Sequence, residues 1–94
     1  MTTWDEAKRR RNLAKHGVDL AIAERFDFET AVIREDDSER YGEQREVATG
    51  RIDDTLYVYV YTLRGEEDHA ISLRKASPKE RRRYAEEISA SYRR

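Results

Sequence analysis

The side chains of this 94-residue chain best suited to proton transfer are its two histidines, His16 and His69. His16 ends the segment "WDEAKRRRNLAKHGV", where Lys15 stands beside it. If this segment is a helix, the macrodipole at its C-terminal end favours the protonated imidazole. A histidine in that place serves either in acid-base catalysis or as an ordinary helix cap or surface residue, and its position leaves both interpretations open.

A carboxylate and a guanidinium alternate at Glu43 and Arg45, where a strand is expected to begin. Residues two apart in a strand share a face, so both side chains point the same way. Such a pair could act as a general base and a phosphate ligand. A cross-strand ion pair would use the same residue types, so this interpretation stays open as well.

Basic residues gather in "HAISLRKASPKERRRY", where an apolar strand is expected to give way to a helix. Arg74 and Lys75 directly precede the start of that helix, and guanidinium groups and exposed helix amides both bind phosphate. The run "KERRRY" could equally be a solvated helix face. The pattern therefore indicates either a phosphate site or a charged surface.

The net charge of -1 and the pI near 6.1 conceal a segregation of charge along the chain. Residues 1–15 carry a net charge of +3, residues 16–73 of -9 and residues 74–94 of +5. If the two ends meet in space, they form a basic surface that suits nucleic acid.

The absence of cysteine excludes disulfides, thiolate nucleophiles and cysteine zinc sites. A metal site would need both histidines and carboxylates, but the pairs Asp36–Asp37 and Asp53–Asp54 fit turns better. We therefore predict no metal and no cofactor. No apolar run approaches the roughly 20 residues that cross a bilayer, and the N-terminus lacks the apolar segment of a signal peptide. We expect a single cytoplasmic domain over residues 1–94 with a small core and no membrane contact.

Two N-terminal helices are predicted. The first is "WDEAKRRRNLAKHGV", with Asp5 or Thr3 as N-cap and Gly17 as C-cap. Its apolar residues, which leave the basic residues outward, are Trp4, Ala7, Leu13 and Ala14. The second helix is "DLAIAERFDF", capped by Asp19, and its expected buried line is Leu20, Ala23 and Phe26.

Four strands follow, with sequences "TAVIRED", "REVATGRID", "TLYVYVYTLRG" and "HAISLRKA", and short turns at residues 53–54 and 65–68 predict antiparallel pairing. In the third strand an aliphatic side, Leu56, Val58 and Val60, alternates with Tyr57, Tyr59 and Tyr61. We expect the aliphatic side to face the core. The tyrosines could stack on nucleobases, but at least two of them are expected to pack beneath a helix.

The last helix opens with Ser77 as N-cap, Pro78 at its first position and Glu80 at its third. Its expected buried stripe is Tyr84, Ile88 and Tyr92. The predicted fold class is α+β, with two N-terminal helices, a four-stranded antiparallel sheet and a C-terminal helix.

Taken together, "WDEAKRRRNLAKHGV", "RYGEQREVATGRID", "VYTLRG" and "ISLRKASPKERRRY" resemble the BrnT toxin family of bacterial type II toxin-antitoxin systems. The matching positions span residues 4–84 in order: Trp4, Asp5, Lys8, Asn12, Lys15, His16, Gly17, Val18, Gly42, Glu43, Arg45, Gly50, Thr62, Arg64, Ile71, Ser72, Arg74, Ala76, Glu80 and Tyr84. The chain departs from the family at His69, where arginine is common, and at Leu20, where phenylalanine is common. The histidine changes the charge beside Ser72.

This resemblance implies a RelE-like α+β ribonuclease that inhibits translation. It also implies a BrnA-type antitoxin with a ribbon-helix-helix DNA-binding domain, which neutralises the toxin. Operator DNA would then be bound only through the antitoxin.

RNA can be cleaved without metal when its own 2′-hydroxyl attacks the neighbouring phosphate. Given the resemblance, Glu43 or His16 is expected to accept the hydroxyl proton, and the other group or Lys15 to return one to the leaving oxygen. The phosphate is expected to be bound by Arg45, Arg64 and Arg74, and the RNA by Ser72, Lys75, Arg81 and Arg82. The alternatives are a binding module without catalysis and a family member that has lost activity but still binds an antitoxin.

Overall fold

The computed structural model describes residues 1–36 and 43–92. Asp37, which we assigned to a turn, Gly42, which we assigned to the family motif, and the side chain of Tyr92 lie outside the described part. The elements in chain order are β1 (Thr2–Thr3), α1 (Glu6–His16), the 3₁₀ helix η1 (Leu20–Arg25), β2 (Val32–Asp36), β3 (Arg45–Ile52), β4 (Thr55–Arg64), β5 (Glu67–Lys75) and α2 (Pro78–Tyr92).

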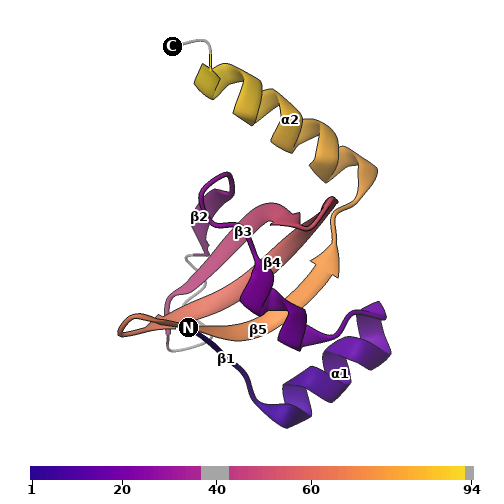
Figure 1. Ribbon diagram of the computed structural model, residues 1–94, viewed down its shortest axis with the longest axis vertical. Coiled ribbons are helices and arrows are strands. Elements are labelled where there is room, and N and C mark those ends of the chain that lie inside the picture. The colour runs from indigo at the N-terminus through magenta and orange to yellow at the C-terminus, as the bar shows by residue number, and fades with distance from the viewer. Residues whose placement is uncertain (37–42, 93–94) are drawn as a thin grey trace.

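The predicted α+β class is confirmed, but the sheet has five strands in the order β1-β5-β4-β3-β2 (Figure 1). Strands β2 to β5 pair antiparallel, as predicted, while β1 pairs parallel with β5. The expectation of a purely antiparallel, four-stranded sheet is therefore wrong, and the second of the two predicted N-terminal helices is a short 3₁₀ helix, Leu20–Arg25. Two residues cannot show the alternation by which strands are recognised, so β1 left no signal in the sequence.

The turns between β3, β4 and β5 are two-residue hairpins, at residues 53–54 and 65–66. Asp53 and Gly65 have φ values of 54° and 63°, the left-handed conformation that tight hairpins require. Because the turns are this short, the strands are held in one register, which fixes the side of the sheet on which each side chain lies.

Helix α1 lies along the β5 edge of the sheet and is attached there by Asn12 (Figure 1). The Asn12 amide donates to the Leu73 carbonyl at 2.8 Å and to the Val18 carbonyl at 2.9 Å, and its oxygen accepts from the Leu73 amide at 2.9 Å. Asp5 caps α1 and Gly17 ends it in the left-handed conformation, as predicted. Leu13, an apolar residue that should be buried on an amphipathic helix, is 53% exposed because Asn12 is the residue that faces the edge.

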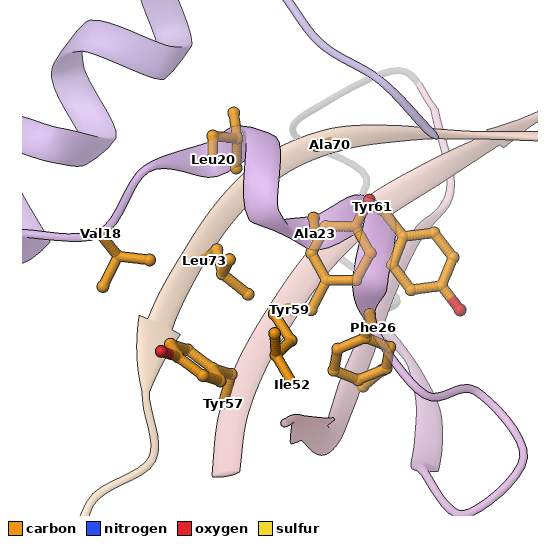
Figure 2. Close-up of a cluster of buried hydrophobic side chains, with 11 residues drawn as sticks. Val18, Leu20, Ala23, Phe26, Ile52, Tyr57, Tyr59, Tyr61, Ala70 and Leu73 are labelled. Atoms are coloured by element: carbon orange, nitrogen blue, oxygen red, sulfur yellow. The ribbon is translucent and has the colours of Figure 1, made fainter. Parts of the chain in front are cut away.

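The hydrophobic core lies on the tyrosine side of β4 (Figure 2). Tyr57, Tyr59 and Tyr61 are all buried, which confirms that they pack within the fold. They face the segment that contains η1, whose predicted line of Leu20, Ala23 and Phe26 is also buried. The expectation that the aliphatic side forms the core is wrong: Val58 is buried, but Leu56 and Val60 are only half-buried.

Close packing and a buried polar network hold this core together. Phe26 lies against β3 at Gly50, where an added Cβ would stand 2.7 Å from the ring. The Tyr59 hydroxyl donates to Asp68 at 2.7 Å, and Thr2 of β1 donates to the same carboxylate oxygen at 2.8 Å. Burial raises the pKa of Tyr59, and the bond to Asp68 raises it further. Strand β1 is thus joined to the core through Thr2.

Helix α2 begins with the predicted capping box, in which the Ser77 amide donates to Glu80 at 2.8 Å and the Glu80 amide to Ser77 Oγ at 3.2 Å. Tyr84 is buried and donates to the Thr30 carbonyl at 2.7 Å, whereas Ile88 is only half-buried. The C-terminal part of the helix projects away from the sheet (Figure 1). Among the described residues, no helix is long and apolar enough to cross a membrane.

Candidate active site

Most of the predicted site residues lie on one face of the sheet, the face opposite to Tyr57, Tyr59 and Tyr61. We call this the polar face. On β4, Arg64 alternates with the buried Tyr61, and on β3, Arg45 alternates with the buried Ala48. On β5, Asp68 points into the core beside Tyr59, so the next residue, His69, points the other way. Ser72 and Arg74 lie on the polar face as well, opposite Val60 and Val58.

At one end of the polar face, Glu43 and Arg64 form an ion pair with His69 nearby. The Arg64 Nη2 atom donates to Glu43 Oε1 at 3.1 Å, and both side chains are 52% exposed. This bond lowers the pKa of Glu43, and the nearby charges of His69 and Lys8 lower it further. Lys8, Glu43, Arg64 and His69 thus form one cluster, which we call the Arg64 end.

His69 is one of two residues of the Arg64 end that our site prediction omitted. Its Nδ1 atom lies 2.8 Å from Thr3 Oγ1 in β1, while Nε2 has no hydrogen-bond partner among the described residues. Burial lowers the pKa of His69, as do the positive charges of Arg64 and Lys8. A neutral imidazole with an available nitrogen is suited to accept a proton near neutral pH.

Arg45 lies at the start of β3, directly opposite Asp36 of β2 in the strand register. It is on the same face as Arg64, and its neighbour Gln44 accepts a hydrogen bond at 2.9 Å from Thr62, which pairs with His69. The predicted residues Glu43, Arg45 and Arg64 therefore belong to one end of the sheet.

At the other end of the polar face, Arg74 is bound to α2. Its Nη1 and Nη2 atoms donate to the two carboxylate oxygens of Glu80 at 2.7 and 2.8 Å. This bidentate bond, together with the cap at Ser77, lowers the pKa of Glu80 to about 2. The arginine fork that was expected to hold a phosphate is thus occupied by a carboxylate of the protein itself.

His16 and Lys15 lie at this same end, near Arg74. Burial lowers the pKa of His16, and the charges of Lys15 and Arg74 lower it further. Burial and the two neighbouring cations thus act in the direction opposite to the helix macrodipole, which favours the protonated ring. Lys15, His16, Arg74 and Glu80 form the second cluster, the Arg74 end.

The two ends are separated along both α1 and β5. Lys8 and His16 are eight residues apart on the helix, a rise of about 12 Å. His69 and Arg74 are five residues apart on the strand, a rise of about 16 Å. The predicted catalytic residues therefore do not surround a single phosphate: Glu43, Arg45 and Arg64 are together, and Lys15, His16 and Arg74 are together elsewhere.

The residues predicted to bind RNA are dispersed. Ser72 is half-buried on the polar face between the two ends. Lys75 is exposed and, by alternation with Arg74, points to the opposite side of β5. Arg81 donates to the Ala76 carbonyl at 3.0 Å, and Arg82 is exposed on α2.

Two members of the Arg64 end, Lys8 and His69, were missing from the predicted site. Both were visible in the sequence, since Lys8 matches the family motif and His69 is a departure from it. The proximity of Lys8 to Glu43 could not be foreseen, because it depends on where α1 lies along β5, whereas the position of His69 follows from the pairing of β4 with β5. Within residues 1–36 and 43–92, no three His, Asp or Glu side chains are grouped so that they could hold a metal ion.

The fold and the polar face define a small α+β protein whose basic groups suit an anionic substrate. The family model described as "Ribonuclease toxin, BrnT, of type II toxin-antitoxin system" matches residues 4–80. The chain therefore belongs to the BrnT family of ribonuclease toxins. Membership implies a protein antitoxin as partner and RNA as target. No curated protein matches the chain.

Proposed function

We propose that the protein is a metal-independent endoribonuclease that inhibits translation, and that RNA is cleaved at the Arg64 end. The observation that carries this assignment is the convergence of Glu43, Arg64 and His69 on one face of the sheet, with Lys8 beside them. These four side chains provide a proton acceptor, a proton donor and cations around an exposed surface.

In the proposed reaction, His69 Nε2 removes the proton of a 2′-hydroxyl, whose oxygen then bonds to the adjacent phosphorus. The bond from phosphorus to the 5′-oxygen breaks, and Lys8 donates the proton that this oxygen requires. The products are a 2′,3′-cyclic phosphate and a free 5′-hydroxyl. Arg64 and Lys8 stabilise the charge that develops on the phosphorane.

Glu43 positions Arg64 in this scheme and does not act as the base. Its pKa is lowered by Arg64, and a carboxylate with a low pKa is a weak proton acceptor. Arg45, on the same face, adds positive charge. His16, Lys15 and Arg74 are too far from His69 to touch the same phosphate, so they contribute positive charge to RNA binding, with Ser72 between the two ends. Lys75, Arg81 and Arg82 lie further away and have at most a long-range electrostatic role.

The proposed partner is a BrnA-type antitoxin with a ribbon-helix-helix domain, and the complex would bind operator DNA through that domain. Membership of a type II toxin-antitoxin family supports this partner. We propose the cytoplasm as the place of action, because translation occurs there. The basic polar face would attract an acidic antitoxin segment.

The test is cleavage of an RNA oligonucleotide in excess chelator, compared with the same oligonucleotide carrying a single 2′-deoxyribose at the cleavage site. We expect the RNA to yield a 2′,3′-cyclic phosphate and the substituted strand to stay intact. Loss of all cleavage in chelator would contradict metal independence. A non-catalytic binding module would bind both strands and cleave neither.

A further inference from the structure

Strand β1 consists of two threonines that act on opposite faces of the sheet. It pairs parallel with β5, placing Thr2 beside Asp68 and Thr3 beside His69. Thr2 points into the core and donates to Asp68, whereas Thr3 points to the polar face and meets the imidazole of His69. The Asp68 amide also donates to the Met1 carbonyl at 3.1 Å, which fixes the chain ahead of both threonines.

In the 2.8 Å hydrogen bond between Thr3 Oγ1 and His69 Nδ1, either atom can be the donor. If the threonine hydroxyl donates, Nδ1 must be unprotonated, and in the neutral ring the proton is then on Nε2. If Nδ1–H donates to the threonine oxygen, Nε2 carries the lone pair. Only the second arrangement survives when Nε2 takes up a proton, because imidazolium has a proton on both nitrogens.

We propose that Thr3 is a positioning residue, which accepts the Nδ1 proton of His69 and so directs the Nε2 lone pair toward the 2′-hydroxyl of bound RNA. This inference rests on the proposed role of His69 as proton acceptor. Strand β1, which left no signal in the sequence, thus sets the tautomer of that base.

The charged groups around His69 agree with this arrangement. Arg64 of β4 and Lys8 of α1 disfavour its protonated form, while Glu43 and Asp5 favour it, and burial lowers its pKa. Burial, Arg64 and Lys8 thus favour the neutral imidazole, and the tautomer of a neutral ring decides which nitrogen can accept a proton. Of the described side chains, Thr3 is the one within hydrogen-bonding distance of the ring.

The experiment compares three variants, Thr3→Val, Thr3→Ser and Thr2→Val, with the parent protein. Thr3→Val removes the acceptor and keeps the shape, Thr3→Ser keeps the hydroxyl, and Thr2→Val is a matched control from the same strand. Nitrogen-15 NMR of the His69 ring gives the tautomer without any need for activity, and single-turnover cleavage across pH gives the rate constant and the pKa of the base.

We expect the parent and Thr3→Ser to have Nδ1 protonated in the neutral ring. Thr3→Val should populate the other tautomer and cleave about 10-fold more slowly. Thr2→Val should lower the melting temperature and leave the ring and the pH profile unchanged. An Nε2-protonated ring in the parent, or full activity in Thr3→Val, would overturn the inference. Full activity in His69→Gln would instead overturn the proposed function, and the NMR result would still decide the polarity of the bond.

Discussion

The two ends of the polar face contain the same kind of ion pair in different settings. At the Arg64 end, Glu43 and Arg64 are joined by one bond of 3.1 Å and are half exposed. At the Arg74 end, both Nη atoms of Arg74 bind Glu80, which also caps α2. Arg64 uses one guanidinium nitrogen for its ion pair, so its other N–H groups can still bind a phosphate. In Arg74 both Nη atoms bind Glu80 and thereby attach α2.

Each end also contains a histidine with a lowered pKa, but the two rings differ in what holds them. His69 is bonded through Nδ1 to Thr3, whereas the ring of His16 has no hydrogen-bond partner among the described residues. A base must be oriented as well as neutral. The comparison supports the proposal that the chemistry takes place at the Arg64 end, whereas the Arg74 end attaches α2.

Replacement of Asn12 should have the largest effect, since α1 supplies Lys8 to one end and His16 to the other. Asn12→Ala leaves the Leu73 amide and carbonyl without their partner at the sheet edge. We expect a loss of about 2 to 4 kcal/mol in the free energy of unfolding. Leu13→Ala, at the neighbouring exposed position, should change it by less than about 1 kcal/mol. Urea unfolding of both variants measures the difference, and equal losses would show that Asn12 does not attach the helix.

Replacing Arg74 should lower the free energy of unfolding more than replacing Arg64. Arg74→Ala should cost about 1 kcal/mol, because a bidentate, partly shielded pair to α2 is lost. Arg64→Ala should cost less than about 0.5 kcal/mol, because its pair is exposed and has a single bond. Thermal unfolding of the two variants checks this order. A larger loss in Arg64→Ala would contradict the structural role given to Arg74.

Acid should weaken the Arg74 end through Glu80. The folded-state pKa of Glu80 is about 2, below its ordinary value of 4.5, so its stabilising contribution is complete above about pH 4.5 and declines as the pH falls toward 2. Glu80→Gln should therefore be less stable than the parent near neutral pH, with a difference that shrinks through this range. Urea unfolding at several pH values measures it. If the stability difference between the parent and Glu80→Gln stays constant down to about pH 2, the ionised Glu80 carboxylate is not the source of that difference.

Local signals in the sequence predicted the local structure. The Ser77 and Glu80 capping box, the turn at residues 53–54 and the buried line of η1 each depend on residues close in the chain, and each is present, while the turn predicted at residues 65–68 is shortened to 65–66. The side of β4 that forms the core could not be predicted in this way. Alternation separates tyrosines from valines, but the segment that covers one of the two sides decides which is buried.

The site was predictable in composition and not in arrangement. Glu43 and Arg64 were predicted and are in contact, although 21 residues separate them in the chain. His16 was predicted to share their site because it matches the family motif, but the length of α1 carries it to the far end of β5. Asn12 was overlooked as a structural residue because a polar side chain that binds a sheet edge looks like any surface residue in a helical pattern.

The most direct test of the account is the single-turnover cleavage rate of Arg64→Ala and of Arg74→Ala at saturating RNA, with circular dichroism to verify that both are folded. If the chemistry lies at the Arg64 end, Arg64→Ala should lose about 100-fold or more in rate, and Arg74→Ala less than about 10-fold. An Arg74→Ala protein that is folded and loses as much as Arg64→Ala, or more, would contradict the assignment of cleavage to the Arg64 end.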